Sequence, residues 1–340
     1  MKLIVILSCK YSGSTITDFM LGAHSQVLSL TELYAFVANN RKPFACKSCQ
    51  PPESCPVWTQ ELTDRLLEIG ARKEVYDAIV QATGTQVLVD SSKLIEHWYA
   101  LTLKGIDPAD IIPVHLSKSP EEYAGSEKNK THVSSLGDID DIADRWWRTN
   151  GEIIDFIETL GSAAVANTIT VRYRDLIDHT PDVLKAILNA AGLDYEPGIE
   201  RYWNFKQHPL WGNKGARSHF DSTDSHPEQW TDESERQKKL YTEQHQTLFR
   251  DEKWRDTLSR AEVDRLWGHP RIASMGALLG YAHPFTPSGE WLNKPTDTWQ
   301  PQTIAGSDLA ARERSARKRD VMSSETVVKI KRRVRKLLRG

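Results

Sequence analysis

Hydroxyl side chains, a glycine and a lysine are concentrated in one short stretch near the start of the chain. Ser8-Cys9-Lys10-Tyr11-Ser12-Gly13-Ser14-Thr15 follows the apolar run Leu3 to Leu7 and precedes Thr17 to Leu21, which has helical spacing. A continuous apolar run of this length is typical of a buried strand. A small-residue loop between a strand and a helix start collects anions, because free backbone N–H groups and the helix dipole point at the same spot. The stretch therefore predicts an anion site, with a tight strand-to-helix turn as the alternative.

The loop supplies further donors and one cation: Ser12, Ser14, Thr15 and Lys10. Its pattern differs from two common phosphate-binding loops. A Walker A loop has Gly-Lys-Ser/Thr after a GxxxxG spacing, and a dinucleotide fingerprint has several glycines, whereas Gly13 stands alone here. The loop is therefore predicted to hold an anion in a different way.

The composition is that of a globular protein. The 340 residues are 39% hydrophobic and 26% charged, which predicts one or two domains. The net charge of -2 is uneven, because Arg312 to Gly340 carries 12 Lys and Arg against 3 Asp and Glu, which leaves -11 for the rest. An acidic body argues against broad nucleic-acid binding. Neither a signal peptide nor a membrane-spanning run is evident, so we expect a cytoplasmic protein.

The basic tail has apolar residues at helical spacing among its lysines and arginines. We expect a basic amphipathic helix at about residues 325–339, within a C-terminal extension of residues 286–340. Residues 321–340 are a candidate contact with a membrane surface or an anionic partner, which would make the cytoplasmic protein peripheral at the membrane. A short coiled-coil seam and a solvated terminal helix are the alternatives, and a homodimer is left open.

Three of the four cysteines lie close together in the sequence, at Cys46, Cys49 and Cys55. Three thiols at this spacing can supply zinc ligands if a fourth comes from elsewhere. No histidine lies nearby in the sequence, so we predict no metal site. The preferred interpretation is a structural group of thiols that packs on Trp58.

Three further apolar runs predict strands that end in polar residues. They are Gln86–Val89 before Asp90-Ser91-Ser92-Lys93, Ile111–Leu116 before Ser117-Lys118-Ser119-Pro120, and Thr168–Val171 before Arg172-Tyr173-Arg174-Asp175. Helical periodicity predicts helices over residues 61–82, 138–160 and 181–191. Strands that alternate with helices and lack period two predict an α/β fold with an open, mostly parallel sheet flanked by helices. Because ligands bind at the carboxyl ends of such strands, we expect these polar clusters to form one site.

The order and spacing of these motifs resemble the sulfotransferase family that depends on 3′-phosphoadenosine 5′-phosphosulfate (PAPS), over roughly residues 2 to 281. The resemblance implies a P-loop-like sulfotransferase fold, with a domain at residues 1–285. It also implies a set of PAPS-binding residues: Lys10, Tyr11, Ser12, Gly13, Ser14 and Thr15 for the 5′-phosphosulfate, Lys118, Ser126, Lys214, Gly215 and Arg217 for the 3′-phosphate, and Tyr173 near the adenine.

The activity implied is transfer of a sulfuryl group from PAPS to a hydroxyl or amine of an acceptor, such as a glycan, lipid or small metabolite. PAP is the product, and no metal is required. Glu32 is the candidate general base, because several branches of the family place a glutamate at a matching distance after the loop. A helix-cap or salt-bridge role is the alternative for Glu32, and His24, His97 and His115 are other candidate bases.

The sequence departs from the family pattern at two cationic positions. Tyr11 stands where the family usually has Lys or Arg, so Lys10 or Lys93 is expected to supply the catalytic cation. Lys118 replaces an arginine, which keeps the charge but loses the bidentate fork. Two other functions are therefore kept open: a domain that binds PAP, PAPS or a glycan without turnover, and a P-loop-type kinase.

Overall fold

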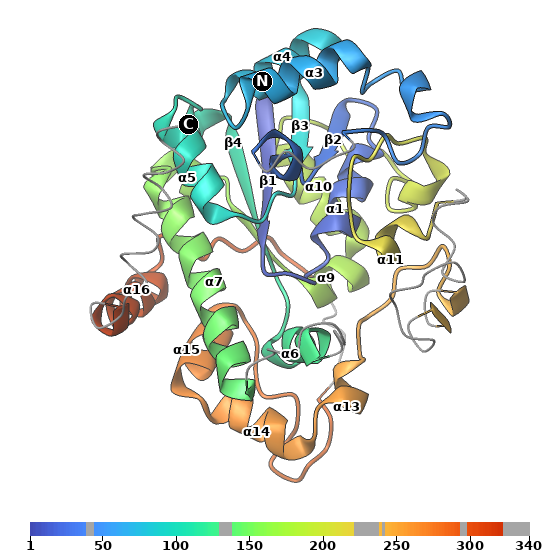
Figure 1. Ribbon diagram of the computed structural model, residues 1–340. Helices are drawn as coiled ribbons and strands as arrows, with labels where there is room; N and C mark the ends of the chain where they lie inside the picture. Colours follow the sequence, from blue (N-terminus) through green and yellow to red (C-terminus); the bar gives the residue numbers. More distant parts are fainter. Residues whose placement is uncertain (39–43, 129–137, 221–237, 240–241, 293–297, 322–340) are drawn as a thin grey trace. The chain divides into compact units, whose positions relative to one another are not determined.

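The computed structural model describes residues 1–38, 44–128, 138–220, 238–239, 242–292 and 298–321 (Figure 1). Its strands form one sheet in the order β2-β3-β1-β4-β5. The strands are β1 Lys2–Ser8, β2 Val27–Thr31, β3 Val87–Asp90, β4 Ile111–Ser117 and β5 Ile169–Arg172. The pairs β1–β3, β2–β3 and β4–β5 are parallel. This confirms the predicted α/β fold with a parallel sheet flanked by helices.

Strand β2 is the one that the sequence did not predict. It is only five residues long, and hydroxyl residues interrupt its apolar pattern at Ser29 and Thr31. Its burial is nevertheless nearly complete, because it pairs with β3 from Val27 opposite Val87 to Thr31 opposite Asp90. Pairing with a distant strand therefore decides the conformation of a segment whose own sequence is ambiguous.

The chain divides into two compact units. The first contains Met1–Ile6, Gly13–Ile112 and Leu184–Phe249, and the second contains Leu7–Ser12, Pro113–Val183 and Arg250–Gly340. The predicted domain limit at residue 285 is a different kind of division and stays a prediction.

In the first unit, α1 packs on β2 and β3. Leu3 to Ile6 of β1 and Phe19 to Leu21 of α1 are fully buried, so both elements contribute apolar side chains to the core of this unit. The helices of this unit are α1 Ser14–Gly22, α2 Tyr34–Val37, α3 Gln60–Ile69, α4 Glu74–Thr83, α5 Ile95–Leu103 and α11 Lys214–Arg217, with short 3-10 helices at Pro52–Ser54, Pro108–Asp110 and Tyr202–Asn204. Helix α10, Thr180–Ala190, continues from the second unit into the first.

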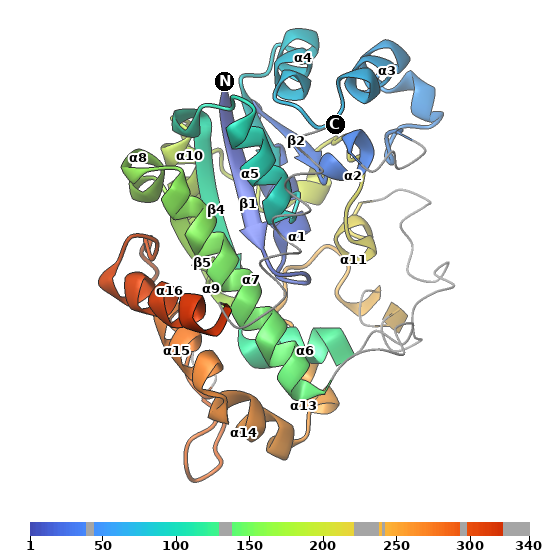
Figure 2. The same cartoon turned by 60° about the vertical axis from the view of Figure 1, so that its left-hand side comes forward.

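The helix predicted over residues 61–82 is wrong in one respect, because two helices occupy this region. Helices α3 and α4 lie side by side (Figures 1 and 2). Gly70 follows the last residue of α3 with φ of 69°, a left-handed conformation that ends a right-handed helix at little cost only for glycine. The apolar periodicity continues through this break, which is why the two helices read as one.

The second unit is built around α7, the long helix predicted over residues 138–160. It extends from Ile139 to Thr159 and buries Trp146 and Trp147. The other helices of this unit are α6 Pro120–Lys128, α8 Ser162–Ala166, α9 Tyr173–Asp178, α13 Trp254–Thr257, α14 Arg260–Gly268, α15 Pro270–Leu278 and α16 Asp308–Val321. Helix α16 lies against α7 and α15 (Figures 1 and 2), where Glu313 accepts a 2.5 Å hydrogen bond from Trp147.

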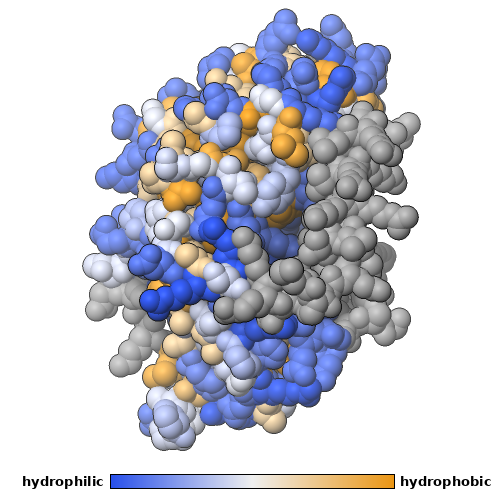
Figure 3. Space-filling view, turned by 90° about the vertical axis from the view of Figure 1, so that its left-hand side faces the viewer, coloured by the Kyte–Doolittle hydropathy of each residue, from blue (hydrophilic) through white to orange (hydrophobic). Residues whose placement is uncertain are grey.

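Within the described ranges, no helix combines the length and the apolar character needed to cross a bilayer. Figure 3 shows one face, on which hydrophobic residues are scattered among hydrophilic ones. The helix predicted at about residues 325–339 lies outside the described residues, as does almost all of the proposed contact segment 321–340.

Candidate active site

The loop between β1 and α1 presents the start of a helix that no side chain caps. Gly13 is the N-cap residue, with φ of 87°, and the first turn of α1 contains no acidic residue. The first N–H groups of a helix have no partner within the helix, and they carry the positive end of its dipole. The end of α1 is therefore suited to an anionic ligand.

Buried hydroxyl groups of the same loop also need a partner. The Ser12 and Ser8 side chains are 0% and 2% exposed, and their oxygens have no hydrogen-bond partner among the described residues. A buried hydroxyl without a partner costs roughly 1–3 kcal/mol, so these groups favour a ligand that accepts hydrogen bonds. Ser14 and Thr15 are also buried, whereas Lys10 is exposed. These residues fit the predicted anion.

Tyr11 has an unusual backbone conformation in this loop. Its φ is 64°, in the left-handed region that non-glycine residues seldom adopt. Backbone strain of this kind costs of order 1–3 kcal/mol and persists where the surrounding structure fixes it, often at binding sites. The position where the family usually has a cation is therefore occupied by a strained aromatic residue.

A late segment of the chain lies against the first turn of α1. Asn213 donates its backbone N–H to Thr15 Oγ1 at 3.4 Å, and its own side chain caps α11 by accepting from the Gly215 N–H at 2.8 Å. A Cβ at Gly212 would lie 2.8 Å from Thr15 Cγ2, so only glycine allows this approach. The predicted residues Lys214, Gly215 and Arg217 follow directly in α11.

Two further candidates of the first unit form an ion pair. Lys93 Nζ lies 2.5 Å from Glu32 Oε1, and the two side chains are 20% and 29% exposed. Glu32 follows β2 and Lys93 follows β3, so the pairing of these two strands brings them together. The salt-bridge role that the sequence allowed for Glu32 is thus present, and the partial exposure leaves its carboxylate within reach of solvent.

Two buried carboxyl groups near these strand ends were not identified as site residues. Ser29 donates a hydrogen bond to Asp18, and Asp90 accepts hydrogen bonds from Tyr76 and from the Ser92 N–H. Burial raises the pKa of Asp18 to about 7 and that of Asp90 to about 6, although these hydrogen bonds oppose the rise. An acidic residue directly before the apolar Phe-Met-Leu of α1 was the available signal for Asp18.

In the second unit, the candidates Lys118, Ser126 and Tyr173 converge. Lys118 is 1% exposed, its Nζ lies 3.2 Å from Ser126 Oγ, and it stands 5.2 Å from the centre of the Tyr173 ring. A carboxylate that the sequence did not indicate joins them, because Asp251 Oδ2 lies 2.6 Å from Lys118 Nζ. Burial favours a higher pKa for Asp251, but the charges of Lys118 and Lys253 outweigh it and hold that pKa at about 2.

The two arginines that flank Tyr173 differ in their contacts. Arg172 forms two hydrogen bonds with Asp175, at 2.6 and 2.9 Å, and a third with the Gly280 carbonyl oxygen. The Arg174 Nε is buried without a hydrogen-bond partner among the described residues. Arg174 is therefore a further candidate for an anionic ligand, and the second arginine of Val171–Leu176 was its signal.

The three histidines considered as bases are packed in the interior. His97 and His115 are 2% and 1% exposed, and burial lowers the pKa of His97 to about 3 and that of His115 to about 4. His115 bonds to Asn150 at 3.0 Å, and His24 bonds to the Asp194 carbonyl oxygen at 2.9 Å. These contacts favour structural roles.

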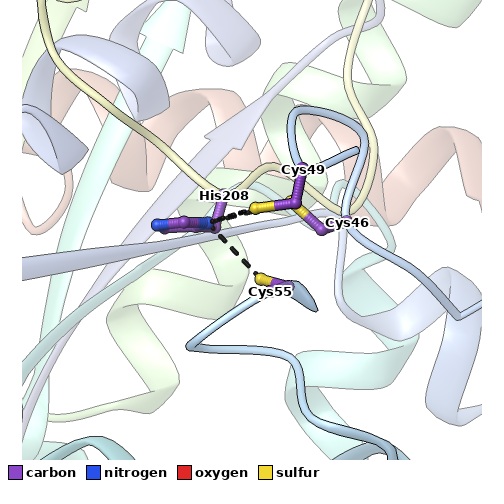
Figure 4. Close-up of side chains that lie close together, drawn as sticks. All are labelled: Cys46, Cys49, Cys55 and His208. Carbon is purple, nitrogen blue, oxygen red and sulfur yellow. Dashed lines mark hydrogen bonds between the residues drawn. The ribbon is translucent and has the colours of Figure 1, made fainter. Parts of the chain in front are cut away.

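The cysteines at positions 46, 49 and 55 meet a histidine that is distant in the sequence. His208 Nδ1 lies 3.3 Å from Cys49 Sγ and 3.4 Å from Cys55 Sγ (Figure 4). The sequence left a fourth ligand to come from elsewhere, and the fold brings His208 to these thiols from about 150 residues further along the chain.

The chain was compared with known proteins. The model of the sulfotransferase family matches residues 4–197. The structure is similar to a sulfotransferase domain from the curacin biosynthetic pathway, with 16% identity, a TM-score of 0.51, and coverage of 83% of this chain and 99% of that one. A sulfotransferase domain of the Synechococcus PCC 7002 olefin synthase aligns with 16% identity, a TM-score of 0.41, and coverage of 58% and 75%. No curated protein sequence matches significantly.

The buried carboxyl of Asp18 predicts a pH-dependent stability. Because its folded pKa of about 7 exceeds the ordinary value of about 3.9, its contribution to the free energy of unfolding falls as the pH rises from about 4 to about 7. We expect Asp18→Asn to gain stability relative to the wild type across this range, by up to about 1.4 kcal/mol per pH unit. Urea unfolding at about pH 5 and pH 8 measures this, with the exposed Asp64→Asn as control. If the free energies of unfolding of Asp18→Asn and the wild type differ by the same amount at both pH values, the prediction is contradicted.

Proposed function

The chain belongs to the sulfotransferase family, and from this premise we propose that it transfers a sulfuryl group from PAPS to a hydroxyl or amine of an acceptor. The observation that carries the proposal is the loop before α1, where an uncapped helix start adjoins the buried hydroxyls of Ser8 and Ser12, which find no hydrogen-bond partner in the described part of the chain. A phosphosulfate offers several acceptor oxygens and negative charge, which this loop can bind.

The proposed reaction breaks the bond between sulfur and the bridging oxygen of PAPS. The electron pair stays on that oxygen and PAP leaves, while the acceptor oxygen or nitrogen forms a new bond to sulfur and loses a proton. As in phosphoryl transfer, charge grows on the leaving oxygen, so positioned donors and a cation contribute most of the rate. The loop N–H groups and Ser12, Ser14 and Thr15 are the proposed donors.

We assign the acid–base and cationic roles to the residues at the ends of β2 and β3. Glu32 accepts the proton of the acceptor, and Lys93, 2.5 Å away, provides positive charge together with Lys10. Lys93 contacts Glu32 directly, so the same lysine orients the base and leaves it half-exposed to an acceptor. Because Tyr11 carries no charge, the positive charge that the family usually has at that position must come from other residues. The position of Lys93 beside Glu32 supports its assignment as one of them.

For the 3′-phosphate, we assign Lys118 and Ser126 in the second unit. The Lys118 ammonium already bonds to the Asp251 carboxylate, with side-chain exposures of only 2% and 13%. A phosphate would therefore replace one anion by another at the same ammonium, and Asp251 would compete with it. Tyr173, next to Lys118, is assigned to the adenine, and Lys214, Gly215 and Arg217 of α11 remain candidate phosphate ligands.

Tyr11 supports a second candidate function, in which the domain binds PAP or a glycan without turnover. Its left-handed conformation places an uncharged side chain at the position of the usual cation. Incubation with labelled PAPS and panels of glycans, lipids, phenols and peptides separates the two functions. Transfer of the label to any acceptor supports the sulfotransferase function. A higher melting temperature in the presence of PAP, with no transfer to any acceptor, supports the binding function.

The double variant Ser12→Ala/Ser14→Ala tests the loop. We expect PAP binding to weaken by about tenfold or more, because hydrogen bonds to a charged group are worth roughly 1.5–3 kcal/mol each. Isothermal titration calorimetry measures the affinity, and Ser54→Ala, an exposed serine of the 3-10 helix Pro52–Ser54, is the control. Unchanged affinity in the double variant would remove the loop from the site.

The variant Glu32→Gln tests the base. We expect the transfer rate to fall by about a hundredfold or more while PAP affinity is retained, because general-base catalysis typically contributes 10²–10⁴-fold. Rates with labelled PAPS measure this, and Glu68→Gln on the exposed surface of α3 is the control. Full turnover in Glu32→Gln would assign the residue to the salt bridge alone.

Opposite effects of Lys118→Ala and Asp251→Asn are expected if Lys118 binds phosphate. Removal of the lysine should weaken PAP binding by about tenfold or more, and removal of the competing charge should tighten it severalfold. Lys128→Ala, which breaks the ion pair between Lys128 at the end of α6 and Glu262 of α14, is the control. If both variants at the buried pair weaken PAP binding equally, the pair has only a structural role.

A further inference from the structure

We propose that Cys46, Cys49, Cys55 and His208 bind a structural zinc ion. The three sulfurs and the imidazole nitrogen all lie within 4.8 Å of one another, and the three cysteines are buried. The distances to His208 Nδ1 are 3.8 Å from Cys46, 3.3 Å from Cys49 and 3.4 Å from Cys55. Figure 4 shows the thiols of Cys49 and Cys55 directed at the same ring nitrogen, with Cys46 beside Cys49.

These distances match the edges of a zinc tetrahedron. With Zn–S near 2.3 Å and Zn–N near 2.0–2.1 Å, tetrahedral angles separate sulfur from nitrogen by about 3.6 Å and two sulfurs by about 3.8 Å. The three observed sulfur–nitrogen separations fall on both sides of the first value. One ion bound to the four atoms therefore requires only small changes along the three sulfur–nitrogen edges, and the sulfurs already lie within 4.8 Å of one another.

Hydrogen bonds alone do not explain the cluster. A neutral imidazole nitrogen has one lone pair and accepts one hydrogen bond, yet three sulfurs converge on Nδ1. A divalent cation that binds thiolates and imidazole satisfies all four groups at once.

The surrounding backbone is arranged to support negative charge on sulfur. The Ser48 N–H donates to Cys46 Sγ at 3.4 Å, and the Trp58 N–H donates to Cys55 Sγ at 3.3 Å. The charge of Lys206 acts on Cys49 and on His208. Three thiolates and one imidazole around Zn²⁺ carry a net charge of about −1, which these donors and this lysine offset.

The site joins two segments that are distant in the sequence. Trp58 Nε1 donates to the His208 carbonyl oxygen at 2.6 Å, and the Lys47 N–H donates to that of Pro209 at 2.8 Å. Trp211 then donates its N–H to Thr31 Oγ1, just before the segment that contacts Thr15. Four protein ligands leave no open position for water or substrate, so the ion is structural and holds residues 208–213 in place.

Metal analysis of the full-length, untagged protein tests the proposal. After reconstitution with Zn²⁺ and gel filtration, we expect about one zinc per chain by inductively coupled plasma mass spectrometry. The variants Cys49→Ser, Cys55→Ser and His208→Ala should lose it. Cys9→Ser is the matched control, because Cys9 lies in the second unit and bonds to Asn150, and it should retain the zinc of the wild type.

Two measurements on the wild type remain decisive if a variant does not fold. Cobalt substitution should give the thiolate-to-metal charge-transfer band and intense visible bands of tetrahedral coordination. A strong chelator should lower the melting temperature by several degrees, and added zinc should restore it. No metal after reconstitution, or a disulfide among the three cysteines by mass spectrometry, would overturn the proposal. Neither measurement depends on sulfuryl transfer.

Discussion

An uncapped helix start at the end of a buried strand is the constraint on which the rest of the site depends. Every helix leaves its first N–H groups without intrahelical partners, and most helices satisfy some of them with a side chain. At α1 the N-cap is Gly13, which has none to offer. The apolar packing of α1 against β2 and β3 holds this end in place, so its unsatisfied donors are a fixed feature of the fold.

Two of the lysines near the strand ends are paired with carboxylates. Lys93 pairs with Glu32, and the buried Lys118 pairs with Asp251. An unpaired charge in the interior is costly, so a lysine buried as deeply as Lys118 needs an anion before any ligand arrives. Binding at such a position is an exchange of anions, in which selectivity depends on how well a ligand replaces the internal carboxylate. The half-exposed pair at Lys93 is less constrained and suits a group that must act on an acceptor.

The proposed zinc and the proposed nucleotide loop are linked by one segment of the first unit. Residues 208–213 begin at the cysteine cluster, contact Thr31 at the end of β2, and reach Thr15 in the first turn of α1. The close approach at Gly212 leaves little tolerance for displacement. A zinc ion bound at His208 would therefore fix the position of Asn213 against Thr15 in the anion loop, and the ion would take no part in the chemistry.

Much of the fold could be predicted because its signals are local. The apolar run of β1, the small-residue loop and the helix after it are adjacent in the sequence, and so are the segment from Lys118 to Ser126 and the long helix α7. The family follows from the order of such motifs and is confirmed by the family model. Local signals also misled, since the periodicity of residues 61–82 hides the helix end at Gly70.

The partners of the key side chains were decided only by tertiary structure. His208 joins cysteines about 150 residues away, Asp251 reaches Lys118 across 133 positions, and Lys93 meets Glu32 through the pairing of β2 with β3. Periodicity reports which face of an element is buried, but it carries no information on which distant segment packs there. The sequence by itself therefore determined most of the elements, the loop and the family. The folded chain determined which charges are compensated and where three cysteines and a histidine meet, because those contacts form only when remote segments share one core.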